Sequence, residues 1–554
     1  LGDSMDVDFD EEFDFVVVGS GGGSMCGGLV LRQAGKSVLV LEKTALLGGT
    51  TSRSGGVMWI PNNRFMAAAG IKDSKEAALA YLEATVGQSV DAPGTSAARR
   101  EAYVDGAPRM VDFLVSQGLK LRRVPYWPDY YDDRNGGSVP GRTVAAQRFD
   151  LNELGEWQHK LRPNFMAIPA VHEEAFEIAT FKSSAKGKLT MFKVGLRMGL
   201  AKLTGKRWTV AGGALQGRMV QAALRAGIDL RVNSRVSGFV ISNDKVVGVK
   251  VAGQSGQRRI RARLGVLVNA GAFAQNQAMR DQYIPGTSAQ WTAAGPGDTG
   301  EMMRAMMDLG AAIGQMDERV GNQMSLPPGT ENTSGEGVDM MQVGSQMDFT
   351  KPHSIIVDQS GVRYMNECGS YMEFCQNMWK RHAQVPAVPS WWIFDQSYVD
   401  NYLLFGTMPG AAKPASLFES GFLKKDDTLT GLARQLNMDP AVFMHTVSRF
   451  NAGAERGKDE QFQRGARAYD NFLGDSYRTP SNTLGPIATG PFYAAPVVPA
   501  DVGTFGGVVT DVHGRVLRAD GSAIEGLYAT GTSTASVMGR YYVGAGSSIG
   551  PSFV

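Results

Sequence analysis

The hydrophobic pattern near the start of the chain predicts a strand, a sharp turn, a helix and a second strand. Residues 15–18 (FVVV) form a short apolar run rich in β-branched side chains, which is typical of a buried parallel strand. A glycine-rich turn follows, and residues 29–33 continue as a helix. A second apolar run at residues 37–41 (SVLVL) ends at Glu42. This order of elements predicts an α/β protein that begins with a Rossmann-like unit.

The turn between this strand and helix has the composition of a dinucleotide-binding site. Its glycines let the backbone turn sharply and approach a ligand, and the N-terminus of the helix favours a pyrophosphate. Glu42 follows Gly19 by 23 residues, a spacing that suits a carboxylate bound to an adenosine ribose. Ser24 replaces the third glycine of G-x-G-x-x-G, a departure that a small residue tolerates. The residues expected at the cofactor are Gly19, Gly21, Gly22, Gly23, Ser24 and Glu42.

A second run of small residues follows soon after Glu42. It offers hydroxyl groups and bare backbone, and it is either a flexible loop or a second wall of the cofactor site. Because a nicotinamide enzyme has no need of such a wall, we favour FAD as the cofactor. The residues expected in this wall are Gly49, Thr50, Thr51, Ser54, Gly55 and Gly56.

Later segments predict the rest of an α/β domain and an inserted second domain. Residues 74–118 have a helical pattern, whereas residues 124–137 (VPYWPDYYDDRNGG) are too rich in proline and tyrosine to form a regular helix. Further elements are expected at 213–226 (helix), 229–232 (strand), 236–251 (hairpin), 265–270 (strand), 355–357 and 391–394 (strands), and 427–437 and 440–451 (helices). We expect an FAD-binding domain formed by residues 1–285 and 484–554, with a mixed α+β catalytic or cap domain at 286–483 closing a substrate cleft.

The segment from Lys182 to Arg207 differs in composition from its surroundings. It contains eight basic residues, and no acidic residue occurs between Glu177 and Asp229. Its apolar residues recur at three- and four-residue steps, at Leu189, Phe192, Leu196, Leu200 and Leu203. A basic helix with one apolar stripe favours an anionic membrane surface. The alternative is an ordinary surface helix docked on its own domain.

Composition narrows the remaining classes of function. The chain has 554 residues, with 56 basic and 54 acidic side chains, so we expect no nucleic-acid partner. Its three cysteines form no C-x-x-C pair, which indicates a reducing, cytoplasmic setting without a disulfide framework, and no metal site is expected. No secretory signal and no transmembrane helix are expected from the apolar runs.

Several motifs resemble known flavoproteins. The layout, with Gly526–Gly531 (GLYATG) as a late strand delivering a glycine, resembles the FAD-binding half of flavoproteins related to fumarate reductase. Three tyrosine motifs are similar to those of the 3-ketosteroid 1-dehydrogenases: WPDYY at 127–131, RYMNECGSY at 363–371 and GRYYVGAGSSIGP at 539–551. The resemblance covers almost the whole chain, and residues 182–207 are its largest departure, looking like an insertion.

The resemblance implies a reaction and a set of roles. Tyr542 and the N–H of Gly546 would bind the ketone oxygen of a 3-keto-4-ene steroid. Tyr371 would take a proton from carbon 2, assisted by Tyr130, and the hydride from carbon 1 would pass to nitrogen 5 of the flavin. Positions implied at FAD also include Lys43, Val236, Ala270, Gly271, Gly531, Ser548 and Ile549. No matched histidine or cysteine would tether the flavin, so noncovalent binding is expected.

General chemistry agrees with these roles. Two hydrogen bonds to a ketone oxygen stabilise developing enolate charge, and a tyrosine base with a reference pKa near 10 needs help to ionise.

Expected partners are a 3-ketosteroid and an external electron acceptor such as a quinone, in sterol degradation. The segment 182–207 adds a membrane surface, with peripheral attachment of the enzyme. Because this segment follows the Tyr130 stretch, we expect it to border the pocket entrance and to favour a steroid with a long side chain. Two alternatives stay open: another reaction on the same fold, namely steroid 4-dehydrogenation or fumarate reduction, and a flavin redox adaptor without substrate chemistry.

Overall fold

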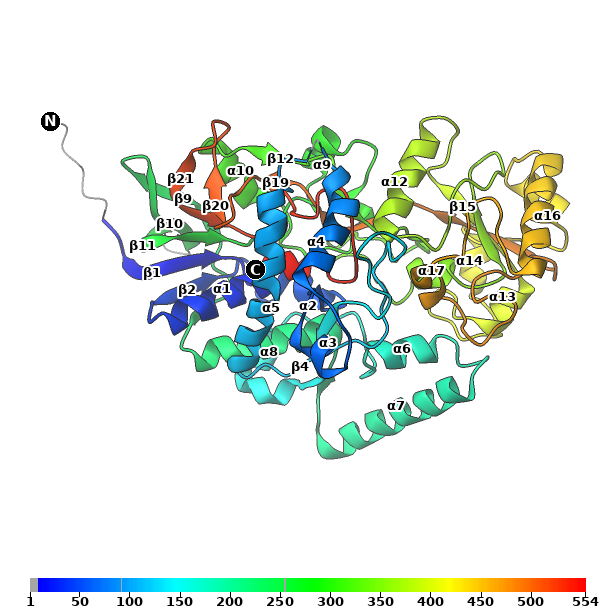
Figure 1. Cartoon of the computed structure of the whole chain (residues 1–554), viewed down its shortest axis with the longest axis horizontal. Coiled ribbons are helices and arrows are strands. Elements are labelled where there is room, and N and C mark those ends of the chain that lie inside the picture. Colours follow the sequence, from blue (N-terminus) through cyan, green and yellow to red (C-terminus); the bar gives the residue numbers. More distant parts are fainter. Residues whose placement is uncertain (1–7, 91, 254–255) are drawn as a thin grey trace.

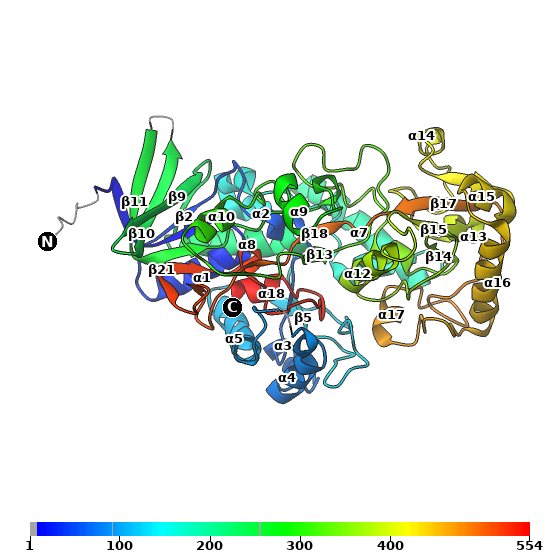
Figure 2. The same ribbon diagram turned by 90° about the horizontal axis from the view of Figure 1, so that it is seen from above.

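The computed structural model describes residues 8–90, 92–253 and 256–554. Its secondary structure divides between a large sheet with flanking helices and a smaller sheet with its own helices, at opposite ends of an elongated molecule (Figures 1 and 2). Described helices do not include one long and apolar enough to cross a bilayer.

An eight-stranded sheet forms the centre of the first part, and its strands come from distant regions of the chain. The order is β20-β21-β11-β1-β2-β8, and the β9–β10 hairpin is added through the pairing of β10 with β11. Strands β21, β11, β1, β2 and β8 run parallel. The strands are β1 (Glu11–Val18), β2 (Val38–Leu41), β8 (Asp229–Arg231), β9 (Val236–Ser242), β10 (Lys245–Gly253), β11 (Gly256–Val268), β20 (Arg515–Leu517) and β21 (Ala523–Ala529).

The continuous apolar run of β1 explains why this sheet is covered on both faces. Val17 belongs to one hydrophobic core, which includes Leu29 of the first helix, whereas Val16 and Val18 belong to the core on the other face. The helices of this part are α1 (Gly22–Gln33), α2 (Gly49–Arg53), α3 (Arg64–Ala68), α4 (Lys75–Ala84), α5 (Ala97–Ser116), α8 (Ala211–Arg225), α9 (Gln277–Tyr283), α10 (Glu301–Asp308) and α18 (Ile549–Phe553).

Besides the large sheet and the smaller sheet, the remaining described strands form four short sheets. They pair β5 with both β3 and β4, β6 with β7, β12 with β19, and β13 with β18. Their bounds are β3 (Val57–Trp59), β4 (Leu121–Arg123), β5 (Thr143–Ala146), β6 (Phe149–Asp150), β7 (Trp208–Thr209), β12 (Ile313–Gly314), β13 (Arg319–Gly321), β18 (Asp501–Thr504) and β19 (Gly507–Val508).

The second part is built on an antiparallel sheet in the order β14-β15-β17-β16. Its strand β17 (Phe492–Val497) pairs with β15 along six residue pairs, so this sheet extends beyond residue 483, where the sequence had placed the end of the inserted domain. The other elements are α11 (Gln346–Phe349), β14 (Ser354–Val357), α12 (Tyr371–His382), β15 (Ser390–Asp395), α13 (Gln396–Asn401), α14 (Ala415–Glu419), β16 (Lys424–Asp426), α15 (Leu429–Gln435), α16 (Pro440–Arg456) and α17 (Ala468–Phe472).

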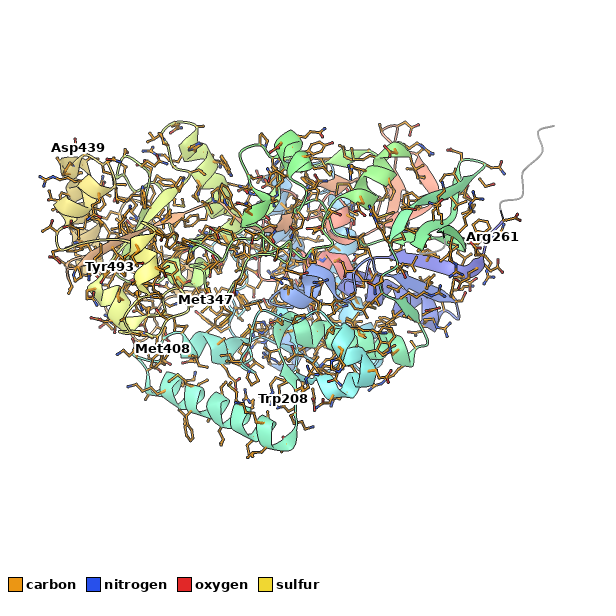
Figure 3. All side chains as sticks on the ribbon, turned by 180° about the vertical axis from the view of Figure 1, so that it is seen from behind. Trp208, Arg261, Met347, Met408, Asp439 and Tyr493 are labelled. Atoms are coloured by element: carbon orange, nitrogen blue, oxygen red, sulfur yellow. The ribbon has the colours of Figure 1, made fainter. Side chains whose placement is uncertain are left out.

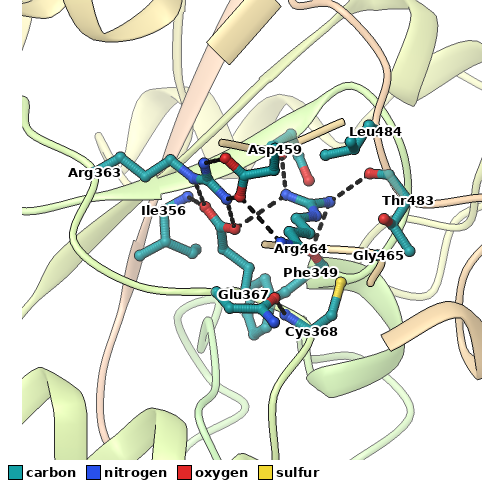
Figure 4. Close-up of polar contacts among 12 residues, drawn as sticks. Phe349, Ile356, Arg363, Glu367, Cys368, Asp459, Arg464, Gly465, Thr483 and Leu484 are labelled. Carbon is teal, nitrogen blue, oxygen red and sulfur yellow. Dashed lines mark hydrogen bonds and ion pairs between the residues drawn. The ribbon is translucent and has the colours of Figure 1, made fainter. Parts of the chain in front are cut away.

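A network of buried charges lies inside the second part (Figure 4). Arg363 pairs with Glu367 at 2.7 Å and with Asp459 at 2.7 Å, and Arg464 lies 3.3 Å from Glu367. Arg464 also donates to the backbone carbonyl of Ser354, at 2.8 Å. The charges are therefore paired, which buried charges require, and they join loops that are far apart in sequence.

The basic segment forms helix α7 (Ala185–Thr204), which lies at the edge of the molecule beside α6 (His172–Ile178) (Figures 1 and 3). Arg197 holds the two helices together through a two-pronged ion pair with Glu174, at 2.7 and 2.8 Å. Val194 is buried on the inner face of α7. The apolar stripe has the opposite orientation and is exposed: Phe192 is 68% exposed and Leu203 is 85% exposed.

Candidate active site

One cavity, about 390 Å³ in volume, extends from the glycine turn after β1 to the tyrosine motifs. Most residues expected at the site line this cavity. They are Gly19, Gly21, Glu42, Lys43, Gly49, Thr50, Thr51, Ser54, Gly55, Gly56, Tyr130, Val236, Ala270, Gly271, Tyr371, Tyr542, Gly546, Ser548 and Ile549. The carboxyl ends of parallel strands β1, β2 and β11 supply the cofactor end, the usual place for a ligand in such a sheet.

Four expected cofactor residues do not belong to the lining of this cavity. Gly22, Gly23 and Ser24 form the first turn of α1, where the N–H of Gly22 donates to Thr51 and the hydroxyl of Ser24 donates to the carbonyl of Asn269. Gly531 packs beside Asn269, because a side chain there would meet the Asn269 amide at 2.7 Å. These four residues shape the turn and its neighbours from behind the cavity wall.

The turn after β1 requires a glycine at its first position. Gly19 has φ of +98°, and a Cβ atom there would lie 2.1 Å from the carbonyl oxygen of Asn269. This close approach brings the end of β11 next to the end of β1. Glu42 at the end of β2 completes this corner, accepting hydrogen bonds from Ser20 at 2.5 Å and from the backbone N–H of Thr44 at 2.8 Å. Its carboxylate is thereby fixed toward the cavity.

The residues fit a bound FAD. A Cβ atom added to Gly55 would meet no protein atom within 4 Å, so this glycine leaves bare backbone open to a planar ligand. Arg53 and Arg162 also line the cavity, and the buried Nε atom of each has no hydrogen-bond partner among the described residues. Two arginines with unused donors suit the anionic pyrophosphate of a dinucleotide.

Three tyrosines from distant parts of the sequence meet at the other end of the cavity. The ring centroids of Tyr371 and Tyr542 are 4.9 Å apart, those of Tyr130 and Tyr371 are 5.4 Å apart, and those of Tyr130 and Tyr542 are 5.9 Å apart. Tyr131 and Tyr541 do not line the cavity and instead pack against each other at 5.4 Å. The structure therefore separates the two members of each adjacent tyrosine pair.

Local structure positions each of these tyrosines. Tyr371 is the first residue of α12, and the hydroxyl of Ser370 before it donates to the carbonyl of Tyr542 at 3.5 Å. The N–H of Tyr130 donates to the carbonyl of Val543 at 2.9 Å, which ties the proline-rich loop to the C-terminal motif. Hydrogen bonds to the backbone carbonyls of Tyr542 and Val543 thus hold the three tyrosine segments together.

Gly546 closes this end of the cavity in a conformation that favours glycine. Its φ is +95°, and a Cβ atom would lie 2.4 Å from the Cα atom of Met58. Its carbonyl accepts from the N–H of Trp59 at 3.2 Å. The Tyr542 hydroxyl lies 3.3 Å from that of Ser548, its hydrogen-bond partner in the same motif.

Burial dominates the electrostatics of the tyrosines. It raises the pKa of Tyr371 well above the usual value, and the neighbouring phenols of Tyr130 and Tyr542 raise it further. Burial also raises the pKa of Tyr130, although contact with Tyr371 and Tyr469 opposes this effect. Tyr371 is consequently protonated near neutral pH, and its use as a base needs a compensating interaction from the bound ligands.

Several lining residues carried no signal in the sequence. Asp298 lies beneath the cofactor end, and burial raises its pKa to about 6. Further lining residues are Phe165, Val320, Asn322, Met340 and Val502. They reach the cavity through tertiary contacts between segments that have no shared motif. Outside the lining itself, Tyr469 from α17 supports Tyr130 by stacking on it, with ring centroids 4.2 Å apart.

Comparisons with known proteins agree with this geometry. Residues 14–549 match the FAD binding domain family. The 3-oxosteroid 1-dehydrogenase of Mycolicibacterium smegmatis is 37% identical over 98% of this chain and 95% of its own length. The 4-oxocyclohex-2-ene-1-carboxylate 5-dehydrogenase of Sinomonas cyclohexanicum is 32% identical over 98% of this chain and 92% of its own. The crystal structure of 3-ketosteroid delta1-dehydrogenase from Sterolibacterium denitrificans, in complex with 1,4-androstadiene-3,17-dione, is 34% identical with a TM-score of 0.89, covering 98% of this chain and 97% of that one.

The fold and the cofactor end of the cavity define a flavoprotein of the FAD-binding class, and FAD is its cofactor. Within that class, the extent and degree of identity place this chain in the 3-oxosteroid 1-dehydrogenase family. The protein is an FAD-dependent oxidoreductase of that family.

Proposed function

We propose that this enzyme introduces a double bond between carbons 1 and 2 of a 3-keto-4-ene steroid. The observation that carries the proposal is the meeting of Tyr371, Tyr542 and Gly546 at one end of a cavity whose other end suits FAD. Apolar side chains between these ends, including Trp127 and Val320, suit a rigid apolar substrate.

The positions of the tyrosines support the roles that we propose for them. The hydroxyl of Tyr542 and the N–H of Gly546 donate to the C3 ketone oxygen and stabilise the negative charge that develops there. This makes the proton on carbon 2 more acidic, and the Tyr371 oxygen accepts that proton while Tyr130 stabilises the ionised phenol. The bound FAD supplies the acceptor for the hydride that leaves carbon 1. The steroid thus loses one proton and one hydride, and its C1–C2 bond becomes double.

Anaerobic mixing with a steroid tests this proposal. Cholest-4-en-3-one or androst-4-ene-3,17-dione should bleach the flavin absorbance in one turnover, and the product should be the 1,4-diene. Bleaching by 4-oxocyclohexanecarboxylate but by neither steroid would instead indicate a monocyclic ketone substrate. No bleaching by any of the three compounds would favour a redox adaptor. A dicarboxylate reductase would reoxidise reduced enzyme with fumarate.

Noncovalent attachment of FAD is part of the proposal. The three cysteines are all buried, and burial raises the pKa of Cys26 to about 12, so none is poised to attack the flavin. Acid precipitation should release the yellow colour into the supernatant. Colour that stays with the precipitated protein would contradict this.

We also propose that α7 attaches the enzyme to an anionic membrane. Its exposed apolar stripe is flanked by Lys188, Lys193 and Lys202, none of which forms an ion pair within the described part of the chain. Each basic residue near an anionic surface contributes about 1 kcal/mol, and the apolar side chains add burial in the headgroup region. Exposure of the whole stripe argues against the alternative of a helix docked by that face on its own domain.

Liposome co-sedimentation tests the attachment. Replacing Phe192 and Leu203 by serine should release the holoenzyme from vesicles containing anionic lipid, and added salt should do the same. Ile241→Ser with Leu264→Ser, which changes two exposed apolar residues elsewhere, should leave binding intact. Equal recovery of all proteins in the supernatant at low salt would refute the proposal.

Membrane attachment suggests substrates and acceptors that partition into lipid. We propose a preference for sterols with a long side chain over bare-ring androgens, in sterol degradation, and a quinone as external electron acceptor. Specificity constants for cholest-4-en-3-one and androst-4-ene-3,17-dione, measured with vesicles, test the first point. Reoxidation of the reduced enzyme by a quinone, compared with cytochrome c, tests the second.

A further inference from the structure

A further cavity, about 320 Å³ in volume, lies behind the cavity that extends from the glycine turn to the tyrosine motifs, the catalytic cavity. The two are separated by β13 and the start of α12. Val320 of β13 lines the catalytic cavity, whereas its neighbours Arg319 and Gly321 line the second one. The same division occurs on α12, where Tyr371 faces the first cavity and Met372 faces the second.

Arg319 is the unusual residue of this second cavity. It is only 6% exposed, its Nε atom is buried without a hydrogen-bond partner among the described residues, and no ion pair within 4.0 Å is found for it there. Other buried arginines of this chain, such as Arg280 and Arg363, are paired with carboxylates. The Glu318 carboxylate is the nearby negative charge, and Glu318 is shared with Arg540, so a guanidinium this far withdrawn from water favours a further anion.

Neighbouring carboxylates are already engaged. Glu318 accepts from the N–H of Arg319 at 3.2 Å and from Gln376 at 3.2 Å, and it lies 3.4 Å from Arg540. Asp317 pairs with Arg540 at 3.1 Å. Lys380 on the rim of the cavity adds a further positive charge.

A second unused donor lies beside Arg319. The indole Nε1 of Trp379 is buried without a hydrogen-bond partner in the described chain, and the guanidinium lies 5.5 Å from the centre of the Trp379 ring. Tyr283, Ile284 and Met372 give the rest of the wall an apolar character. The cavity therefore offers a fork of donors, an aromatic face and apolar walls.

We propose that this cavity is a binding site for a small carboxylate with an aromatic or alicyclic body. The carboxylate pairs with Arg319 and accepts from Trp379, and the ring of the ligand lies on the apolar wall. A guanidinium fork matches a carboxylate in geometry as well as in charge. The site is independent of the steroid reaction proposed above, although it shares β13 and α12 with that cavity.

Calorimetric titration of the holoenzyme with benzoate, at constant ionic strength, tests the site. Arg319→Met should weaken benzoate binding by about tenfold or more, because a charge-assisted pair is lost. Trp379→Phe keeps the aromatic ring and removes only the donor, so it should weaken binding less. Arg381→Met is the matched control. Arg381 lies on α12, like Trp379, but is paired with Asp358 at 2.7 Å, so its loss should not change benzoate affinity. Benzyl alcohol, which lacks the charge, should bind no differently to wild type and to Arg319→Met.

Thermal unfolding gives an independent reading. Without benzoate, Arg319→Met should melt no lower than wild type, whereas Arg381→Met should melt lower because Asp358 loses its partner. Benzoate should raise the Tm of wild type and leave that of Arg319→Met unchanged. Three outcomes would overturn the proposal: a large loss of Tm in Arg319→Met, no benzoate binding by the wild type, or benzoate binding that neither Arg319→Met nor Trp379→Phe weakens. Each would show that Arg319 serves only to pack against Trp379.

Discussion

At the scale of single residues, the tyrosines at the end of the cavity are distinguished by which way each one faces. Tyr371 and Tyr542 line the cavity, whereas Tyr131 and Tyr541 pack together outside it. Adjacent tyrosines in a sequence motif are equivalent until tertiary structure orients them. Substitutions at these positions therefore test the proposed roles directly.

Replacing Tyr371 with phenylalanine removes the proposed base and keeps the ring. We expect most turnover to be lost while FAD and steroid binding remain, as measured by steady-state kinetics and by steroid-induced changes in the flavin spectrum. Tyr131→Phe is the matched control and should turn over normally. Near-normal turnover of Tyr371→Phe would exclude the residue as the base.

The pH dependence of the reaction should reflect the raised pKa of Tyr371. Burial disfavours the charged phenolate, so the fraction of enzyme with an ionised base increases as pH rises toward the folded-state pKa. We expect kcat/KM to increase from neutral toward alkaline pH. A profile that falls over the same range would be inconsistent with a tyrosine base.

Gly546 should not tolerate even a methyl group. Gly546→Ala forces an unfavourable positive φ and a contact with the backbone at Met58, which displaces the proposed N–H donor. Loss of one such donor typically lowers the rate by roughly a hundredfold to a thousandfold, and Tyr542→Phe should have an effect of the same order. Gly521→Ala, at φ of +84° but with open space around it, should retain activity. Full activity in Gly546→Ala would remove this residue from the ketone site.

At the scale of elements, the hydrophobic pattern was most informative where a strand or helix is regular. Residues 15–18 belong to β1, and the amphipathic period at 182–207 corresponds to α7. The hairpin around Asn243 and Asp244 was also predicted from the sequence. Both residues adopt positive φ in the turn, a conformation that asparagine and aspartate tolerate better than most residues. Local periodicity carries this information because the backbone of a strand or helix fixes which of its own side chains share a face.

Contacts between elements were beyond the reach of the pattern. The pairing of β17 with β15, like the placement of Arg53 and Arg162 at the cavity, depends on how distant segments pack. The periodicity of one segment does not specify which distant segment it will contact. The motif glycines were found because their backbone geometry restricts the residue type, whereas Gly22, Gly23 and Ser24 share the motif without facing the cavity.

The buried ion network of the second part should be essential for its stability. Glu367→Gln leaves Arg363 and Arg464 with an excess of buried positive charge, and breaking such a network costs about 3–5 kcal/mol. Denaturant unfolding should show this loss. Glu460→Gln, in an exposed ion pair with Arg456, should leave the midpoint almost unchanged. Equal effects of the two substitutions would mean that the buried network contributes no more to the free energy of unfolding than an exposed ion pair does.

At the scale of the whole molecule, α6 and α7 connect the two parts. Ser183 donates to Asp475 at 2.6 Å, and Phe176 packs edge-on against Phe472 with ring centroids 4.9 Å apart. His172 at the start of α6 contacts the carbonyl of Gly55 through Nε2 at 2.6 Å, at the wall of the catalytic cavity. The helix pair thus contacts the cofactor wall on one side and α17 on the other.

The attachment proposed for the exposed stripe of α7 would change what substrate concentration means for this enzyme. A protein lying on a bilayer meets its sterol by diffusion in two dimensions, so the rate is set by the mole fraction of sterol in the lipid. Inert phospholipid added at a fixed total amount of sterol then dilutes the substrate, although the bulk solution is unchanged. A cell would control such an enzyme through the composition of its membrane as much as through the supply of steroid.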